Sequence, residues 1–275
     1  MMLKNITHRK GKMEDFIKAI ATVEISDEKR KEALAEIVSE TTLEVLFNGQ
    51  SIAKIACCGS NIDELAIGFL FAEGIIASNN EIENILVLSS PNIVKVCGKD
   101  VNGIEKYQND HITSSGAKIS STLYNKTNKQ GQTGNEKVNS TLTISEQQIA
   151  LLFDELVNNA QIHQRTRGTH SGAIADQNGI IVLREDIGRH NVADMLAGYS
   201  ILNEMDMSDK YVVRTGRVSA EIVTKYYKMG INIILSLSVP TLSAIEFAKK
   251  MGISLVSAGR SGRVFIYTGS ERIVK

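Results

Sequence analysis

The seven residues Glu185-Asp186-Ile187-Gly188-Arg189-His190-Asn191 combine two acids, an arginine and a histidine in one short stretch. An apolar run at 180–183 precedes them, and Val192, Met195, Leu196 and Tyr199 follow at helical spacing, which predicts a buried strand, a tight turn and a helix. Gly188 permits the turn and Asn191 is the expected N-cap. Backbone N–H groups at such a helix start favour an anion. An ordinary capped turn with a solvated ion pair fits this stretch equally well.

Further polar residues follow the other strands predicted in this half of the chain. Thr215-Gly216-Arg217 comes after the strand 211–213, and Ser238-Val239-Pro240-Thr241 comes after the strand 231–237. Ligands of wound α/β sheets lie beyond the carboxyl ends of the strands, so these turns should meet. Arginine forks match phosphate geometry. The sequence therefore predicts a phosphate or polyanion site made of Arg189, His190, Asn191, Thr215, Gly216, Arg217 and the turn Ala258, Gly259, Arg260, Ser261, Gly262 and Arg263.

Thr169 and His170 precede a further strand, 171–175, and join this candidate site. His170 could donate to a phosphate or orient a loop, and a histidine satisfied within the sheet is the alternative. For His190, beside Arg189 at the helix start, we expect a contact with the ligand or with a loop.

The three cysteines, Cys57, Cys58 and Cys97, are too few for a disulfide scaffold. At Cys57 and Cys58 we expect buried, inert thiols, with a reactive vicinal pair as the alternative. No C-x-x-C and no H-x-E occurs in the sequence, so zinc is not expected.

The composition is that of a soluble globular protein, with 43% hydrophobic and 23% charged residues. Lys plus Arg and Asp plus Glu number 31 each, so net charge predicts neither nucleic acid nor an anionic membrane as a partner. The sequence has no apolar stretch near the roughly 20 residues of a membrane span and no apolar signal core. The expected location is the cytoplasm.

Three regions are predicted. Residues 1–39 are expected to be a variable helical extension, because apolar side chains near 16–20 and 34–38 recur at helical spacing. Residues 40–139 should hold a hairpin around Asn48-Gly49, a helix near 61–74, two strands, and a polar, mobile loop at about 98–139. Residues 140–275 should form an α/β ligand-binding domain, since strands and helices alternate there after a helix at 143–158.

A set of ordered motifs resembles the formate dehydrogenase accessory sulfurtransferase family, FdhD/NarQ. They are Asp63–Leu70, Glu73–Ile76, Gly168–His170, Glu185–Asn191, Gly216–Ser219 and Pro240-Thr241. The resemblance implies a cytidine-deaminase-like α/β fold, a wound mixed sheet with helices on both faces, without zinc, beside a smaller N-terminal α+β part. It also implies a role in maturing molybdenum formate dehydrogenase. Family members take sulfur from a cysteine desulfurase and transfer it to the bis-molybdopterin guanine dinucleotide cofactor, which the stretch Ala258 to Arg263 would bind. The expected assembly is a homodimer.

The chain departs from the family where sulfur is carried. The family loop runs Thr-Ser-Ser-Cys-Gly-x-Cys-Gly, whereas the corresponding stretch here is Thr113 to Ser120, with Gly116 and Ile119 at the cysteine positions. Neither side chain can form a persulfide. Three hypotheses follow: a maturation factor that binds and delivers the cofactor, a sulfurtransferase using Cys57, Cys58 or Cys97, and a non-catalytic homologue that binds a GDP-like guanine nucleotide.

Overall fold

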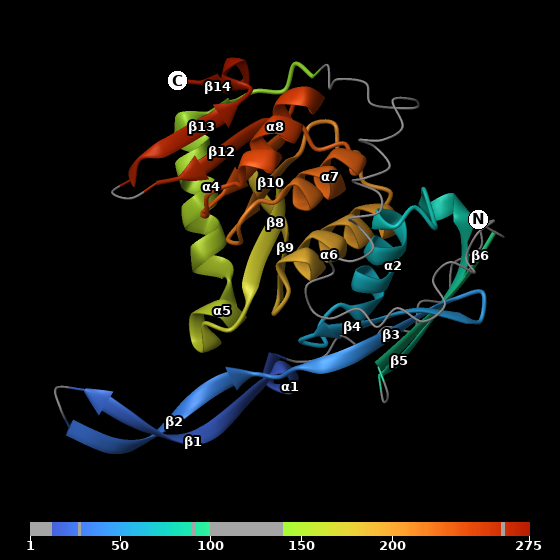
Figure 1. Ribbon diagram of the computed structural model, residues 1–275, viewed down its shortest axis with the longest axis vertical. Helices are drawn as coiled ribbons and strands as arrows, with labels where there is room; N and C mark the ends of the chain where they lie inside the picture. Colours follow the sequence, from blue (N-terminus) through green and yellow to red (C-terminus); the bar gives the residue numbers. More distant parts are fainter. Residues whose placement is uncertain (1–12, 27–28, 90–91, 100–139, 260–261) are drawn as a thin grey trace.

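The computed structural model describes residues 13–26, 29–89, 92–99, 140–259 and 262–275. Two sheets with helices between them form the body, and a long two-stranded hairpin projects from it (Figure 1). The predicted loop at about 98–139, including Gly116 and Ile119, lies outside the described residues except at its first positions, and so do Arg260 and Ser261.

The larger sheet has six strands in the order β13-β12-β11-β10-β8-β9. Strands β10, β11 and β12 are parallel, whereas β8 and β13 run antiparallel to their neighbours. This is the wound mixed sheet that was predicted, with these bounds: β8 (His170–Asp176), β9 (Gly179–Asp186), β10 (Tyr211–Arg214), β11 (Ile233–Ser236), β12 (Ser254–Ala258) and β13 (Val264–Thr268).

Helices cover both faces of this sheet, which confirms the fold class. Side chains alternate between faces along each strand. On β10, Val212 packs toward α6 (Arg189–Leu202), α7 (Ala220–Lys228) and α8 (Leu242–Met251), whereas Tyr211 and Val213 pack toward α4 (Glu146–Asn159). The short α5 (Gln161–Thr166) follows α4, and the pair β7 (Ile144–Ser145) and β14 (Ile273–Val274) joins the two ends of this region.

The smaller sheet has the order β4-β3-β6-β5. Its strands are β3 (Thr41–Phe47), β4 (Gln50–Cys57), β5 (Ile82–Ser89) and β6 (Asn92–Gly98). Asn48 and Gly49 both have positive φ, 48° and 82°, in the hairpin turn that the Asn-Gly pair predicted. A short 3-10 helix, Asn79–Glu81, leads into β5, and another, Ser270–Arg272, leads into β14.

Helix α2 (Ile62–Ala72) lies between the small sheet and α6. The two helices cross at glycines: a Cβ on Gly68 would lie 1.7 Å from the carbonyl oxygen of Asp194, and one on Gly198 would lie 1.9 Å from that of Glu64. Only glycine allows the backbones to approach this closely. This contact holds the two sheets together and sets the position of α6, which begins at the predicted site.

The N-terminal region corrects the sequence prediction. Among its described residues, only the single turn α1 (Met13–Phe16) is helical: β1 (Ile17–Ser26) and β2 (Lys29–Val38) form an antiparallel hairpin, with Ile17 opposite Val38. The apolar spacing and the helix-forming residues of 29–38 suggested a helix, but cross-strand pairing determines the local structure, since such propensities are weak.

Candidate functional site

The predicted site residues that the structure describes come from turns and strand ends at one edge of the large sheet, although not all of their side chains face it. Register places the carboxyl ends of β10, β11 and β12 side by side, because Arg214 lies opposite Ser236, which lies opposite Ser257, and β9 ends at the same edge on the far side of β8. The antiparallel β8 begins at the same edge, with His170 opposite Asp186. The turns after four strands and the start of a fifth therefore share one end of the sheet, as the strand-end argument predicted.

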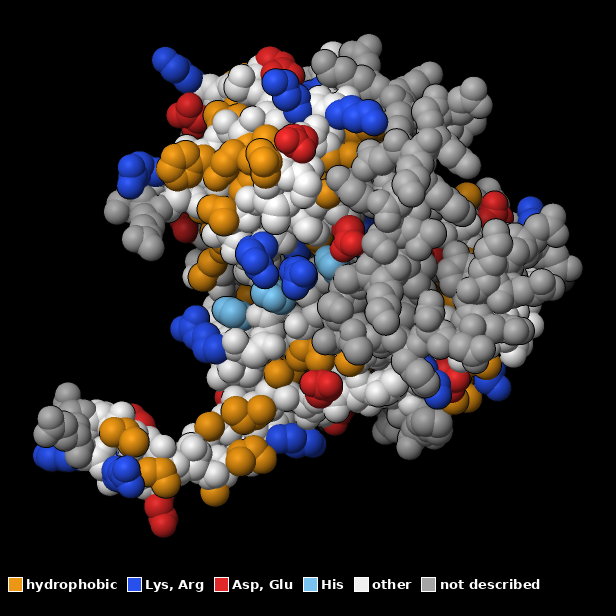
Figure 2. Space-filling view, viewed as in Figure 1, with side chains coloured by type: hydrophobic (Ala, Val, Ile, Leu, Met, Phe, Trp, Pro, Cys, Tyr) orange, Lys and Arg blue, Asp and Glu red, His pale blue; other side chains and the backbone are white. Residues whose placement is uncertain are grey.

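Gly216 lies at the centre of this edge. A Cβ built on it would lie 3.1 Å from Arg189 Cβ, 3.1 Å from Arg214 Nη2 and 3.3 Å from His170 Nδ1. The absence of a side chain therefore lets three cationic or titratable groups from α6, β10 and β8 approach one another. Arg217 follows and is exposed to solvent. Figure 2 shows arginine or lysine and histidine side chains gathered on the surface that faces the hollow above the hairpin.

Arg214 is a residue of this site that the sequence analysis missed. Its side chain is buried, and its guanidinium donates to Gly216 O at 3.1 Å, to the Tyr226 hydroxyl at 3.0 Å and to Arg189 O at 3.3 Å. It therefore fixes both the turn after β10 and the start of α6. Its place as the last residue of an apolar strand, directly before Thr215-Gly216-Arg217, is the signal that could have revealed it.

Cations at this edge are close enough to affect one another. The pKa of His170 is lowered, first by burial and then by the positive charges of Arg214, Arg189, His163 and Arg217. The pKa of Arg189 is lowered by burial and by the charges of Arg217 and Arg214, while the carboxylate of Glu221 acts more weakly in the opposite direction. Burial is the largest cause of both shifts, and the neighbouring cations add to it. An anion bound here would favour the charged forms of both side chains.

Thr215 connects the turn to β8: its hydroxyl accepts from Ser171 N at 2.9 Å, and its own N–H donates to Ser171 O at 2.9 Å. Thr169 is buried, and its carbonyl meets His163 Nδ1 at 2.6 Å. Helices α7 and α8 begin at the same edge and carry the side-chain N-caps Ser219 and Thr241. The N-cap of α8 is Thr241, and Pro240 directly precedes it.

His190 and Asn191 do not face the solvent at this edge. His190 is 2% exposed, its Nε2 lies 3.7 Å from Glu221 Oε2, and burial together with the charges of Lys225 and Arg189 lowers its pKa to about 2. Asn191 donates to Asp186 Oδ1 at 2.6 Å and to Ala56 O at 2.8 Å. The N-cap of α6 is Gly188, not Asn191 as expected from the sequence. Both side chains therefore support the turn between β9 and α6 from the protein interior.

The two acids of the corner are also used within the fold. Glu185 accepts the backbone N–H groups of Ile162 and His163, at 2.9 and 2.7 Å, at the start of α5. Asp186 accepts from Cys58 N at 2.8 Å and Gly188 N at 2.9 Å, and burial raises its pKa. These carboxylates tie the small sheet and α5 to the corner, and they leave the edge without a solvent-facing acid from this stretch.

From the turn after β12, the structure describes Ala258, Gly259, Gly262 and Arg263. Gly259 N donates to Arg263 O at 2.6 Å, and Gly262 has φ of 71°. A Cβ on Gly259 would lie 2.4 Å from the Phe265 ring. The two glycines are therefore required by the turn itself, and Arg263 is exposed beside it.

Two of the three thiols are inaccessible. Cys57 and Cys58 are 0% and 2% exposed, and burial raises the pKa of Cys57 to about 12. Burial and the charge of Asp186 also raise the pKa of Cys58, whose Sγ lies 3.2 Å from Ser60 Oγ. This confirms the expectation of buried thiols there. Cys97, near the end of β6, is exposed.

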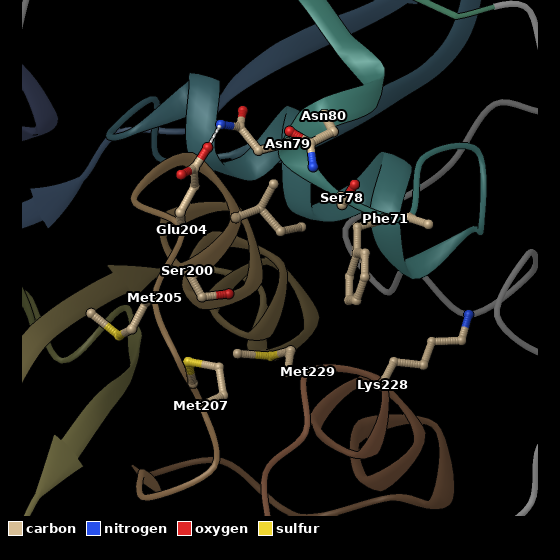
Figure 3. Close-up of a pocket in the computed structure, with 12 residues that line it drawn as sticks. Phe71, Ser78, Asn79, Asn80, Ser200, Glu204, Met205, Met207, Lys228 and Met229 are labelled. Atoms are coloured by element: carbon tan, nitrogen blue, oxygen red, sulfur yellow. Dashed lines mark hydrogen bonds between the residues drawn. The ribbon is translucent and has the colours of Figure 1, made fainter. Parts of the chain in front are cut away.

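A separate hollow of about 440 Å³ lies at the other ends of α6 and α7 (Figure 3). Met205, Met207 and Met229 line it together with Phe71, Asn79 and Lys228. The 14 residues of α6 span roughly 20 Å at 1.5 Å per residue, so this hollow is far from the strand-end edge. It includes none of the predicted site residues.

No helix in the described ranges has the length and apolar character needed to cross a membrane. In the same ranges, no three His, Cys, Asp or Glu side chains gather as a metal site.

The fold and the strand-end edge define a class of α/β protein with a cationic site at the carboxyl ends of its strands, and comparison with known proteins gives the family. The profile of the FdhD/NarQ family matches residues 38–274. The chain belongs to the FdhD/NarQ family.

Curated relatives agree with this assignment. The sulfur carrier protein FdhD of Staphylococcus aureus strain MRSA252 is 33% identical over 254 residues, which cover 92% of this chain and 94% of that protein. The protein of the same description from strain Newman has the same identity and coverage. Among solved structures, a candidate formate dehydrogenase accessory protein from Desulfotalea psychrophila shares the fold, with a TM-score of 0.76 and 23% identity over 94% of this chain and 100% of the other.

Proposed function

We propose that this protein is an accessory factor in the maturation of molybdenum formate dehydrogenase, and that its strand-end edge binds the bis-molybdopterin guanine dinucleotide cofactor through its phosphates. Family membership and the names of the relatives support the role. The cofactor is cargo here: the protein would hold it and release it to the formate dehydrogenase apoenzyme.

The observation that best supports phosphate binding is the accumulation of positive charge around Gly216. Arg189, Arg214 and Arg217 each lower the pKa of His170, and two of them lower that of Arg189. Arg214 is buried, Arg189 is half-buried and Arg217 is exposed, and Glu221 offsets the positive charge around Arg189 only in part. An edge that brings like charges together in this way suits an anionic ligand.

The residues present suit phosphate groups. The planar guanidinium groups of Arg217 and Arg189 can donate to phosphate oxygens at this edge. Arg214 holds the turn in place through its hydrogen bonds to Gly216 O and Arg189 O. Arg263 lies on the turn after β12, two strands from β10 in the same sheet. Such a spread of cations fits a ligand with several phosphates, such as a dinucleotide, better than a single inorganic ion.

Sulfur transfer from a cysteine desulfurase is the second candidate function, and the thiols decide how it could occur. The persulfide route needs a thiolate that attacks the donor's outer sulfur and releases the donor cysteine as thiolate. Burial removes Cys57 and Cys58 from that chemistry. The exposed Cys97 is then the remaining candidate carrier, and without it the protein would bind and deliver the cofactor only.

Calorimetry with GDP as the probe tests the binding proposal. Arg217→Ala should weaken binding by about 1.5–3 kcal/mol, the usual loss for a hydrogen bond to a charged group. The matched control is Arg30→Ala, an exposed arginine on β2 of the projecting hairpin, which should bind GDP like wild type. Equal affinities of wild type and Arg217→Ala would refute the assignment of the site.

Two further measurements separate the candidate functions. Incubation with a cysteine desulfurase and ³⁵S-labelled cysteine should label wild type only if Cys97 carries sulfur, and Cys97→Ser should then remove the label. Mass spectrometry of the protein purified under native conditions should detect the pterin cofactor. A plain guanine nucleotide alone would favour a regulatory homologue instead.

A further inference from the structure

The projecting hairpin is a part of the molecule that the other described residues leave largely uncovered. Five aliphatic side chains on β1 and β2 are between 47% and 75% exposed: Ile20, Val23, Ile25, Leu34 and Ile37. Figure 2 shows hydrophobic side chains along much of this arm. A two-stranded hairpin is at best marginally stable by itself in water. An exposed apolar edge strand also invites pairing with another chain.

The base of the hairpin, by contrast, is fixed to the body. Ile17 is buried, Ser39 N donates to Phe16 O at 2.7 Å, and Arg165 of α5 donates from Nε to Glu36 Oε2 at 2.9 Å. A second hydrogen bond joins the Arg165 guanidinium to the same carboxylate. The arm is thus held out at a defined angle, and ten-residue strands reach about 33 Å from that base.

The outer edge of β1 has no strand partner among the described residues, where β1 pairs with β2 alone. Its sequence, Ile17-Lys18-Ala19-Ile20-Ala21-Thr22-Val23-Glu24-Ile25-Ser26, contains no proline and only two charged residues. These two, Lys18 and Glu24, stand at equal distances on either side of Ala21. An antiparallel pair of β1 strands with its twofold axis at Ala21 would therefore place each Lys18 opposite the Glu24 of the other copy.

The remaining positions are compatible with the same register. Ala19 would face Val23, Ile20 would face Thr22, and Ala21 would face Ala21 of the second copy. Because Leu34 lies opposite Ala21 within the hairpin, the central row would read Leu34-Ala21-Ala21-Leu34 across four strands. The charged row also alternates in sign, since Lys31 lies 2.9 Å from Glu24 within the hairpin.

We infer that the outer edge of β1 is a self-association surface, on which a second copy of this chain pairs antiparallel about Ala21 to form a four-stranded sheet. A twofold contact of identical surfaces is the commonest way in which soluble chains assemble. Four strands with a shared apolar face have the independent stability that two lack. The family resemblance implies a homodimer but no surface for it, and this inference does not depend on what the strand-end site binds.

Disulfide trapping of the full-length chain tests the register. In a background with the exposed Cys97 changed to Ser, Ala21→Cys should form a covalent dimer under mild oxidation, because residues opposite each other in a strand pair lie within disulfide reach. Ala33→Cys, on the inner strand β2, is the matched control. It should remain monomeric, because β2 and its copy would be three strand spacings, about 14 Å, apart.

Sedimentation equilibrium tests the charge pattern without cysteines. Wild type should be a dimer, and Lys18→Glu should raise the dimer dissociation constant about tenfold, because two symmetric attractions become repulsions. Inverting the whole row with Lys18→Glu, Glu24→Lys and Lys31→Glu should restore dimerisation. A monomeric wild type, cross-linking of Ala33→Cys as readily as Ala21→Cys, or unchanged dimerisation of Lys18→Glu would each overturn the inference.

Discussion

Charged residues are arranged in opposite ways in two neighbouring parts of this molecule. Where α2, α6 and α7 pack together, the buried Lys225 meets Asp194 at 2.5 Å, and Lys228 donates to Ala72 O at 2.6 Å. At the strand-end edge, Arg189, Arg214 and Arg217 lie near one another. The first arrangement satisfies its charges within the chain, which is what stability requires. The second leaves positive charge in excess despite the nearby Glu221, an excess that stability does not explain and the proposed anion binding would.

The largest effect on stability should come from breaking the buried ion pair between Lys225 and Asp194. Asp194→Ala leaves Lys225 buried without its carboxylate, so the free energy of unfolding should fall by about 3–5 kcal/mol in urea titrations. The matched control replaces both partners, as Asp194→Leu with Lys225→Met, and should recover most of that loss. If the double replacement is as unstable as Asp194→Ala, the ion pair is not the cause.

Removing charge from the strand-end edge should leave stability almost unchanged and weaken ligand binding. Arg217→Ala should leave the free energy of unfolding within about 0.5 kcal/mol of wild type, because Arg217 is exposed and its neighbours are also positive. Its GDP affinity should nevertheless fall, as proposed above. Loss of stability equal to that of Asp194→Ala would show that the two regions do not differ in the way described.

The pH dependence of stability offers a finer test near the boundary of the two regions. Burial lowers the pKa of His190 to about 2, so its folded form stays neutral while the unfolded histidine, near 6.5, gains a proton. Its contribution is therefore present above pH 6.5 and is lost as the pH falls below it, by up to about 1.4 kcal/mol per pH unit. His190→Gln should flatten the unfolding free energy measured between pH 6.5 and pH 5.

Glu73 acts in the other direction in part of the same range. Burial raises its pKa from 4.5 to about 7, so the folded carboxyl keeps its proton to higher pH. Its contribution is fully present below about pH 4.5 and is lost as the pH rises through 7. Glu73→Gln should therefore remove a decline in stability between pH 5 and pH 7, measured by the same titrations. An unchanged slope would exclude Glu73 as the titrating group.

The smallest effect is expected at an exposed pair. Arg165 and Glu36 join α5 to the base of the hairpin, with side chains 36% and 40% exposed. Solvent screens such pairs, so Arg165→Ala should leave the unfolding transition close to that of wild type. Limited proteolysis of the hairpin is the more sensitive measurement, and faster cleavage of the arm in Arg165→Ala would show that the pair fixes its base.

The sequence by itself determined the large sheet and the edge that carries the candidate site. The alternation of strands and helices after residue 140 could be predicted, because apolar runs and helix-ending glycines such as Gly252, with φ of 72°, are local signals. The strand-end rule then brought Arg189 and Arg217 together correctly, since it depends on topology alone. The motifs between residues 63 and 241 were also sufficient to indicate the FdhD/NarQ family.

Only the tertiary structure decided which of these side chains face the solvent. His190 adjoins Arg189 in sequence, yet the first lies beneath α7 and the second at the edge, because successive residues of a helix point in different directions. Arg214 belongs to the site because it makes three hydrogen bonds that the spacing of residues in the sequence does not predict. Residues 17–38 form a hairpin because cross-strand pairing along both strands outweighs a weak helical preference, and the apolar spacing of the sequence does not reveal that pairing.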